Sequence, residues 1–388
     1  MPPENAYLIA ARRSALGRVG GLHKSRRVED LAAPVISAAL ADCGLKPREV
    51  DEIIVGNASE GGNPARLIAL AAGLSETCTA STVDRQCGSG LEAILSAIRM
   101  IGCADAGIVV AGGAESISNA PWRIAKPRNV HQTPRFLGLE TGEVNDSDVS
   151  QELEAAEMLS RRLGFSRGEQ DAWALKSHLK AAAAREQRRF VGEIVPLRSN
   201  AEEARDQSAV EPDLEDLEKL PPIIAQDGTL TIGNTSLLHD GAAFTVIVSE
   251  AIWDRLERPQ ALRLVGSAAQ GVAPDKDGAA PIEAARKLLA RLGNFDPQRI
   301  GVVEVSENSA AQALAVSREL GIDSDRVNPD GGAVVRGHPH GAAGAVLPVR
   351  LFTRMVRSTV SERPTHGLAL LGTRGGMGLA ALFETVRG

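Results

Sequence analysis

Short apolar runs alternate with longer helical patterns along most of the chain. Between the apolar runs, Ala and Leu recur at helical spacing over 28–45 and 89–106. This alternation predicts an α/β fold whose sheets are covered by helices. Four of the runs are bounded by Gly and polar residues, as expected of buried strands: AYLIAA at 6–11, EIIVGN at 52–57, AGIVVAGGAES at 106–116 and AFTVIVSE at 243–250.

The second half of the chain repeats this order. Strand-like runs at 261–272 and 300–307 are each followed by a helical pattern, at 282–293 and 309–322. A Gly-rich turn, another helical run and an apolar stretch from 367 to 384 complete the repeat. The repetition predicts an internal two-fold duplication, which a chain of 388 residues is long enough to hold.

The interval 120–233 breaks the alternation. It contains a basic, Pro-containing stretch at 121–136, a long polar helical pattern at 165–190 and an acidic run at 210–220, which we interpret as the solvated start of a helix. We expect the interval to be an inserted, more exposed subdomain that covers the mouth of an active site. The predicted units are an N-terminal half formed by 1–119 and 234–252, the insert at 120–233, and a C-terminal half at 253–388.

The composition is that of a globular protein with few aromatic residues in its core. Hydrophobic residues make up 43% of the chain and charged residues 24%, while aromatic residues make up only 3%. The core is therefore expected to consist of Ala, Val, Leu and Ile packed close to backbone. The formal net charge of −6 argues against a nucleic-acid partner, which would need clustered Lys and Arg.

Cysteine usage and the lengths of the apolar runs limit the compartment and the metal chemistry. Cys43, Cys78, Cys87 and Cys103 form no C-x-x-C pair and no Cys/His cluster along the sequence, so we expect no metal centre and a reducing compartment. The N-terminal apolar run is short and is followed by Arg pairs, unlike a signal peptide. No run approaches the roughly 18 apolar residues of a membrane span. The cytoplasm is the expected location.

Cys87 lies in VDRQCGSGLEAI, where a strand pattern gives way to a Gly-flanked helix start. Backbone N–H groups and the helix dipole at such a terminus stabilise a thiolate, and Gly88 and Gly90 leave room for a substrate to reach the sulfur. This arrangement suits a nucleophile. Taken alone, the motif fits a buried structural Cys beside a tight turn somewhat better.

Two further Gly-rich turns carry candidate chemistry. His338 lies in GGAVVRGHPHGAAGA at 331–345, and within hydrogen-bond reach of Cys87 it could take the thiol proton. In isolation it fits a loop histidine equally well, and His340 fits a surface residue. The turn GTRGGMGLA at 372–380 offers N–H groups for an oxyanion hole. A phosphate cradle or a plain connection between strands would have the same pattern.

Together these turns fall in the order and spacing of the thiolase superfamily, which the chain resembles over almost its whole length. The nucleophile motif is DRQCGSGLEA, and NPDGGAVVRGHPHGAAGA is close to the histidine motif. DGTLTIGNTSLLHDGAAFTVIVSE is similar to the family signature before the central crossover. The resemblance is to acetyl-CoA acetyltransferases and 3-ketoacyl-CoA thiolases.

The resemblance implies two similar α/β halves in a five-layered αβαβα core, with an inserted loop domain that helps to bind coenzyme A. It implies an acyltransferase of fatty acid metabolism that loads an acyl group from a (3-keto)acyl-CoA onto Cys87 and passes it to CoA or acetyl-CoA. His338 matches the residue that activates the nucleophile, and Ser236 matches a serine near the pantetheine arm. No permanently bound cofactor is implied, and a homodimer or homotetramer is expected.

The chain departs from the family at three catalytic positions. Ser306 stands where an Asn of an N-E-A-F motif orders a water in one oxyanion hole, so that water is lost or held differently. Gly372 stands where a second catalytic Cys moves the proton at the substrate α-carbon, so no acid/base side chain remains there. Arg374 stands where a Gly N–H completes the second oxyanion hole. Its amide can still serve, and its guanidinium either favours the Cys87 thiolate or points outward.

Other positions bear on the substrate channel and on the missing proton carrier. Gln151 and Asp277 occupy places where the motif alignment leads us to expect His and Met, which predicts a more polar channel near the thioester. Glu307, Asn308 and His340 are candidate replacements for the missing acid/base, and Glu307 is also a candidate support for the oxyanion.

Three functions fit these residues. The first is thiolase-type acyl transfer with a slow carbon–carbon step, since losing a proton-transfer group costs about 10² to 10⁴ in rate. The second is thioester hydrolysis, a decarboxylative condensation or transfer to another acceptor on the same scaffold. Decarboxylation makes the carbanion without α-proton abstraction, so Gly372 is no handicap there. The third is a non-catalytic thiolase-like subunit that binds a partner or acyl-CoA. We prefer the first.

Overall fold

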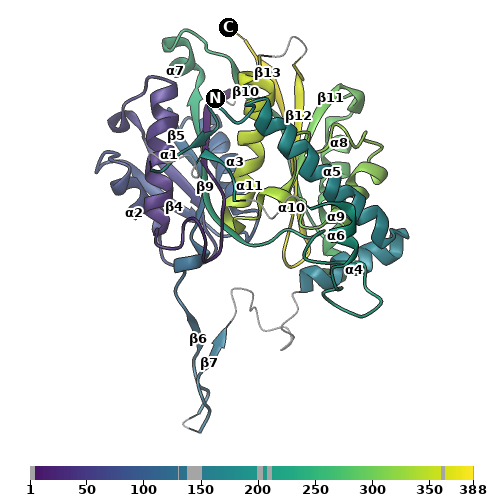
Figure 1. Ribbon diagram of the computed structural model, residues 1–388. Coiled ribbons are helices and arrows are strands. Elements are labelled where there is room, and N and C mark those ends of the chain that lie inside the picture. The colour runs from purple at the N-terminus through teal and green to yellow at the C-terminus, as the bar shows by residue number, and fades with distance from the viewer. Residues whose placement is uncertain are drawn as a thin grey trace.

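One large sheet runs through the molecule and is built from two halves (Figure 1). The computed structural model describes residues 5–129, 131–137, 151–198, 204–207, 212–359 and 363–387.

The N-terminal half of the chain forms the first half-sheet. Its strands, in chain order, are β1 (Ala6–Ser14), β3 (Glu52–Gly56), β4 (Thr79–Val83), β5 (Ile108–Glu115) and β9 (His239–Ser249). In space they follow the order β1-β9-β5-β3-β4, with β3 parallel to β4 and β5, and β9 antiparallel to its neighbours. The helices of its connections are α1 (Val28–Asp42), α2 (Pro64–Ala71) and α3 (Ser89–Gly102).

The C-terminal half repeats this arrangement. Its strands are β10 (Ala261–Gly271), β11 (Ile300–Val305), β12 (His366–Thr373) and β13 (Met377–Val386), in the spatial order β10-β13-β12-β11. An isolated parallel bridge between Val303 and Val327 takes the place that β4 has in the first half. The helices are α8 (Ala280–Leu292), α9 (Ala310–Glu319), α10 (Ala333–Arg336) and α11 (His340–Phe352).

The matching strand orders confirm the predicted duplication. β10 corresponds to β1, and these two strands join the half-sheets through the antiparallel pairs Tyr7–Arg263 and Leu8–Leu262. The apolar runs predicted as strands and the patterns predicted as helices are strands and helices in the structure, with ends that differ by a few residues.

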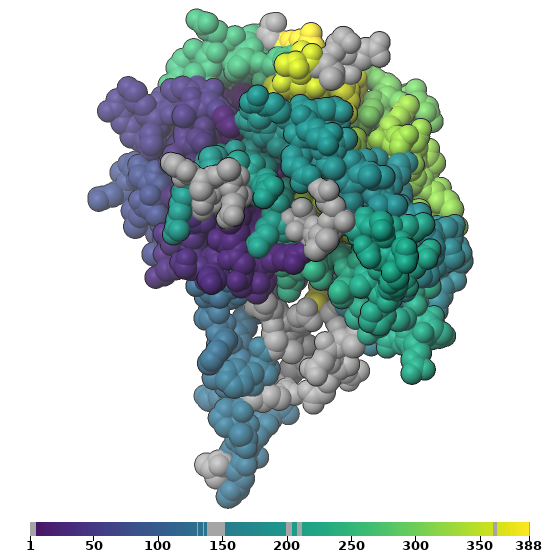
Figure 2. Space-filling model, in the orientation of Figure 1, coloured from purple at the N-terminus to yellow at the C-terminus, as the bar shows by residue number. Residues whose placement is uncertain are grey.

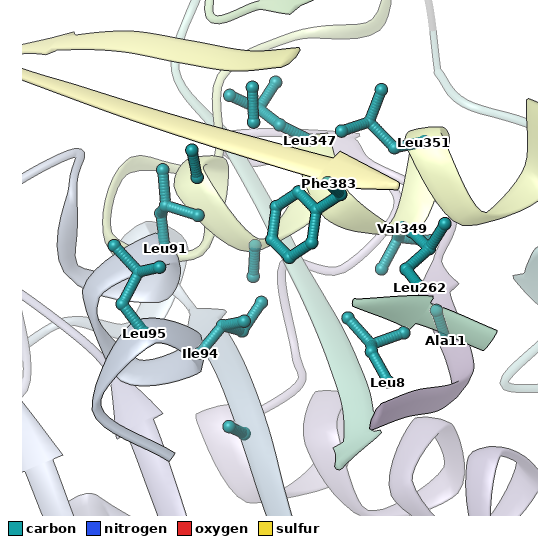
Figure 3. Packing of buried hydrophobic residues seen from close by; sticks show 14 of the residues in the cluster. Leu8, Ala11, Leu91, Ile94, Leu95, Leu262, Leu347, Val349, Leu351 and Phe383 are labelled. Carbon is teal, nitrogen blue, oxygen red and sulfur yellow. The ribbon is translucent and has the colours of Figure 1, made fainter. Parts of the chain in front are cut away.

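Buried apolar clusters separate five layers, as the family resemblance implied. The first cluster joins α1 and α2 to the outer face of the first half-sheet, and the third joins α8 and α9 to the outer face of the second. The middle cluster contains α3 and α11 and receives side chains from both half-sheets. Figure 3 shows the Phe383 ring among Leu91 and Ile94 of α3 and Val349 of α11.

Close contact between α3 and α11 depends on glycine. A Cβ atom on Gly344 would lie 2.7 Å from the Leu91 nitrogen, and one on Gly90 would lie 2.7 Å from the Ala345 nitrogen. The Gly344 N–H also donates a hydrogen bond to the Cys87 carbonyl at 3.2 Å. The two helices therefore hold their N-terminal ends side by side at the centre of the molecule.

The chain between β5 and β9 departs from the repeat. A hairpin of β6 (Arg123–Ala125) and β7 (Arg135–Leu137) extends away from the body (Figures 1 and 2). It is followed by α4 (Gln151–Leu163), α5 (Arg167–Glu186) and α6 (Leu214–Glu218). The remaining short elements are β2 (Gly17–Arg18), β8 (Ile194–Val195) and α7 (Glu250–Arg255).

The two helix predictions made for the chain between β5 and β9 are confirmed. α5 covers the predicted polar helix and is capped by Ser166, directly before its first residue, whose side chain accepts the Glu169 N–H. α6 begins in the acidic run, where the Asp213 side chain accepts the Asp216 N–H, as predicted for the solvated start of a helix. Among the described residues, no helix is both long enough and apolar enough to span a membrane.

Candidate active site

Cys87 lies in the turn between β4 and α3. Gln86, directly before it, has a φ of +52°, a left-handed conformation that costs a non-Gly residue about 1–2 kcal/mol. Ser89 closes the turn, because its Oγ accepts the Arg85 N–H at 2.8 Å and donates to the Gln86 carbonyl at 2.5 Å. The turn presents the Cys87 side chain, which is 1% exposed, to the start of α11.

His340, the first residue of α11, contacts Cys87 directly. Its Nδ1 lies 3.5 Å from Cys87 Sγ, and the residue is only 8% exposed. The next residue anchors the helix start, since the Gly341 N–H donates to Glu115 Oε2 at 2.9 Å. The alternative that His340 is a surface residue is therefore wrong.

His338 lies beside the same thiol. One ligand atom each of Cys87, His338 and His340 lie within 4.8 Å of one another. The backbone of His338 is fixed, because its N–H donates to the Leu237 carbonyl at 2.9 Å and its carbonyl accepts the His239 N–H at 3.0 Å. Its side chain is buried, and within the described part of the chain neither ring nitrogen has a hydrogen-bond partner.

The surroundings of His338 keep its imidazole neutral. Burial is the main cause that lowers its pKa to about 3, and the charges of His340, His239 and Arg374 lower it further. A neutral imidazole has one ring nitrogen that donates and one that accepts. His338 therefore has both a donor and an acceptor available for a substrate.

Cys87 is a thiol in the resting site. Burial raises its pKa well above the ordinary value, and the Glu152 and Asp277 carboxylates raise it further. The Arg374 charge and a hydrogen bond from the Arg374 N–H lower it, but they do not outweigh burial. Removing the side chain from water opposes the negative charge more strongly than these groups favour it. Cys87 needs a base.

Asp277 is a buried carboxyl in the same site. It accepts hydrogen bonds from the Gly375 and Gly376 N–H groups of the turn between β12 and β13. Burial, followed by the charge of Glu152, raises its pKa to about 7. Its charge also acts on Cys87. Asp277, which the sequence singled out, is therefore a buried carboxyl close enough to Cys87 to act on its pKa.

Arg374 points into the protein. Its side chain is 13% exposed, and its Nη2 lies 4.0 Å from Glu152 Oε2. The outward-pointing alternative is therefore wrong. Glu152 is the second residue of α4, so the chain between β5 and β9 contributes directly to the site. Gln151, the first residue of α4, has a side chain outside the part of the chain that the structure describes.

The two altered family positions share one neighbour, Gln312 of α9. Ser306 Oγ donates a hydrogen bond to Gln312 Oε1 at 3.2 Å. A Cβ atom on Gly372 would lie 3.1 Å from Gln312 Nε2. The Gln312 amide thus lies between these positions. Sequence analysis missed this residue, because only the fold brings the start of α9 next to the end of β12.

Glu307 and Ser236 have partners of their own. The Glu307 carboxylate accepts Trp173 Nε1–H at 2.7 Å and the Val334 N–H at 3.1 Å, and burial raises its pKa. These bonds tie Glu307 to α5 and α10.

Ser236 is bonded to Asn308. The Ser236 N–H and Oγ both donate to the Asn308 carbonyl, at 3.0 and 3.3 Å. The Asn308 side chain donates to Glu152. Asn308 thereby links Ser236 to Glu152, which lies with Arg374 and Asp277 on the charged side of the site.

Glu115, at the end of β5, is a second residue that sequence analysis missed. Its carboxylate accepts the Gly341 N–H at 2.9 Å, the Ala58 N–H at 3.1 Å and the Asn57 side-chain amide at 2.9 Å. Burial raises its pKa to about 7. It fixes the start of α11, and with it His340. The sequence did offer a signal for Glu115, because it ends an otherwise apolar strand and a buried carboxylate needs a specific partner.

Known proteins match this chain over almost its whole length. The family models described as "Thiolase, N-terminal domain" and "Thiolase, C-terminal domain" match residues 6–251 and 258–385. An acetyl-CoA acetyltransferase of Chromobacterium violaceum is 38% identical over 97% of this chain and 98% of its own length. One of Allochromatium vinosum is 35% identical over 98% and 99%.

A crystal structure also matches this chain over its whole fold. The Bacillus anthracis acetyl-CoA acetyltransferase matches with a TM-score of 0.90 at 34% identity, over 99% of this chain and 100% of that chain. The comparisons favour acyl transfer over the hydrolytic, decarboxylative and non-catalytic alternatives. Together with the duplicated fold and the buried Cys/His site, they show that the chain belongs to the thiolase family and is a thiolase-type acyltransferase.

Proposed function

We propose that the chain accepts an acyl group from a coenzyme A thioester on Cys87 and passes it to CoA or to acetyl-CoA. The observation that carries this proposal is the contact between Cys87 Sγ and His340 Nδ1, in a buried site that also contains His338. In the loading step, a histidine takes the thiol proton and Sγ attacks the thioester carbonyl. The C–S bond to CoA breaks, and the CoA thiolate leaves with that proton.

The two histidines have different tasks in this proposal. His340 takes the proton from Cys87, since its ring nitrogen lies at hydrogen-bonding distance from the sulfur. His338 donates its ring N–H to the thioester oxygen, because its ring nitrogens have no protein partner. The family resemblance assigns activation of the nucleophile to His338. The geometry supports His340 for that step and leaves His338 for the oxyanion.

His340 is also our proposed replacement for the missing proton carrier. Gly372 has no side chain, and Asn308 has no titratable group. The Glu307 carboxylate is already bonded to Trp173 and Val334. His340, by contrast, contacts the nucleophile directly. We expect a carbon–carbon step that is slower than acyl loading.

The charged side of the site suggests which acyl groups fit. Asp277, Glu152 and Arg374 lie near Cys87, where a long aliphatic chain would desolvate them without replacing their hydrogen bonds. We therefore propose short or polar acyl groups as substrates. Ser236, half-buried and bonded to Asn308, is proposed to lie along the pantetheine arm of CoA.

The organisation of the chain is also a proposal. The division into 1–119 with 234–252, 120–233, and 253–388 is supported by the two repeated half-sheets and by the departure from the repeat between β5 and β9. A homodimer or homotetramer, a cytoplasmic location and the lack of a permanently bound cofactor are proposed from the family. Four free cysteines support a reducing compartment.

Mass spectrometry tests the proposed function. The protein is incubated with acetyl-CoA, acetoacetyl-CoA and longer acyl-CoAs, quenched in acid and digested. An acyl adduct on the peptide that contains Cys87 is expected, strongest for the short acyl groups. Cys87→Ser should lose that adduct, and Cys103→Ser, which removes an exposed thiol, should keep it. An unmodified Cys87 across all chain lengths would overturn the proposal.

A further inference from the structure

Cys87 lies far in sequence from His338 and His340, and the fold brings the three side chains into a compact Cys/His cluster. We propose that this cluster binds one thiophilic divalent metal ion, such as Zn²⁺, and that the bound ion switches off acyl loading by occupying the Cys87 sulfur. This goes beyond the proposed function, since it describes a reversible inhibitory site.

The spacing of the ligand atoms is close to that of a metal site. Zinc binds sulfur at about 2.3 Å and imidazole nitrogen at about 2.0–2.1 Å, so tetrahedral ligand atoms lie roughly 3.3–3.6 Å apart. The distance from Cys87 Sγ to His340 Nδ1 is already 3.5 Å. All three ligand atoms lie within 4.8 Å of one another, so a shift of about 1 Å by His338 completes the set.

The free ring nitrogens of His338 point to a ligand. Buried polar atoms in folded proteins almost always have a hydrogen-bond partner, yet both ring nitrogens of this buried side chain lack one among the residues that the structure describes. A neutral imidazole and a thiolate are the ligand types that Zn²⁺ prefers. The backbone bonds of His338 to Leu237 and His239 hold it beside Cys87 without using its ring.

The surroundings suit a cation. Asp277 and Glu152 act on Cys87 as negative charges and Arg374 as a positive one, so two carboxylates face one guanidinium when all three are ionised. Binding replaces the thiol proton: Cys87–SH and M²⁺ give a Cys87–S–M⁺ bond and a released H⁺. The sulfur lone pair that would attack a thioester is then bonded to the metal, so acylation and metal binding exclude each other.

Cobalt spectroscopy tests the site without any acyl substrate. The purified full-length chain, stripped with a chelator, is titrated with Co²⁺ and then with Zn²⁺. One ion per chain is expected, with a thiolate-to-cobalt charge-transfer band that Zn²⁺ removes. Cys87→Ser should lose the band. His340→Leu should weaken binding by about tenfold or more, because even the loss of a residue that only supports a metal ligand costs about that much. Cys103→Ser and His131→Gln, both at exposed positions, should bind like the wild type.

A wild type without the charge-transfer band would overturn the proposal, and this result does not depend on whether any variant folds. Binding that is unchanged in folded Cys87→Ser would also overturn it.

Alkylation provides a second measurement. Zn²⁺ should protect Cys87 from iodoacetamide and block the acyl adduct, and a chelator should restore both. If metal-free protein forms no adduct but still binds Co²⁺ through Cys87, the proposed function fails while the metal site stands. If the adduct forms and Zn²⁺ neither binds nor blocks it, the metal site fails alone.

Discussion

His340 Nδ1 lies 3.5 Å from Cys87 Sγ, although one residue begins α11 and the other precedes α3. The contact exists because α3 and α11 pack closely through Gly90 and Gly344. It provides a base for a thiol whose pKa is raised by burial. Reactivity in this site is therefore expected to depend on the histidine and on the helix contact that holds it.

The first prediction concerns that base. His340→Leu should slow acylation of Cys87 by about 10² or more, because a thiol with a raised pKa has lost its proton acceptor. Rapid-quench measurement of the first turnover checks this. His131→Gln, at an exposed position, is the matched control and should be unchanged. If His340→Leu loads normally while His338→Ala does not, the base is His338 instead.

The second prediction concerns the missing proton carrier. Gly372→Cys should raise the rate of thiolysis, since it supplies an acid/base at the substrate α-carbon, where such groups contribute about 10² to 10⁴. The new Cβ lies 3.1 Å from Gln312 Nε2, so the Gln312 side chain must move slightly. The gain should therefore be larger in a Gln312→Ala background.

Gly372→Ser is the control for this second prediction, because it adds similar bulk without a thiol. Thiolysis that is equal in the Cys and Ser variants, in both backgrounds, would contradict the idea that Gly372 limits the carbon–carbon step.

The fold was more predictable than the site, for a physical reason. Strands and helices are encoded by local periodicity, so the runs at 52–57 and 89–106 could be assigned from their own residues. Repetition of the same order predicted the duplication. The resemblance of whole motifs then implied the five layers, which no single segment encodes.

Most contacts within the site could not be predicted from local sequence patterns, because they join segments that are distant in the sequence. Glu115 bonds to Gly341, and Gln312 lies beside Gly372, although each pair is far apart in sequence. Glu152 was missed although its neighbour Gln151 was singled out. The motif alignment identified the start of α4 as part of the site, but it did not identify Glu152 as the residue that faces Arg374.

The third prediction tests the helix contact. Gly344→Ala would place a Cβ 2.7 Å from the Leu91 nitrogen and should lower the free energy of unfolding by about 1–3 kcal/mol, since backbone atoms cannot move aside cheaply. Gly168→Ala in exposed α5 is the control, because a Cβ there meets nothing within 4 Å. It should be neutral or slightly stabilising. Denaturant unfolding measures both, and equal stability of the two variants would argue against the close contact.

The last prediction uses the buried carboxyl of Asp277. Burial raises its pKa from 3.8 to about 7, so between these values the folded protein keeps a proton that the unfolded chain has released. Its contribution to stability is therefore complete at low pH and is lost as the pH rises through about 7. Asp277→Asn keeps an oxygen for the Gly375 and Gly376 N–H groups but removes the titration.

The free energy of unfolding of the wild type, measured by denaturant unfolding, should consequently fall more than that of Asp277→Asn between about pH 5 and about pH 8, by roughly 2–3 kcal/mol. Asp275→Asn, at an exposed position in the same short helix, controls for the loss of a carboxylate and should follow the wild type. Other groups whose pKa is raised, such as Glu115, titrate in all three proteins and cancel in the comparison. Parallel curves for the wild type and Asp277→Asn would mean that Asp277 is ionised in the folded protein at low pH, because Arg374 and the turn amides then outweigh its burial.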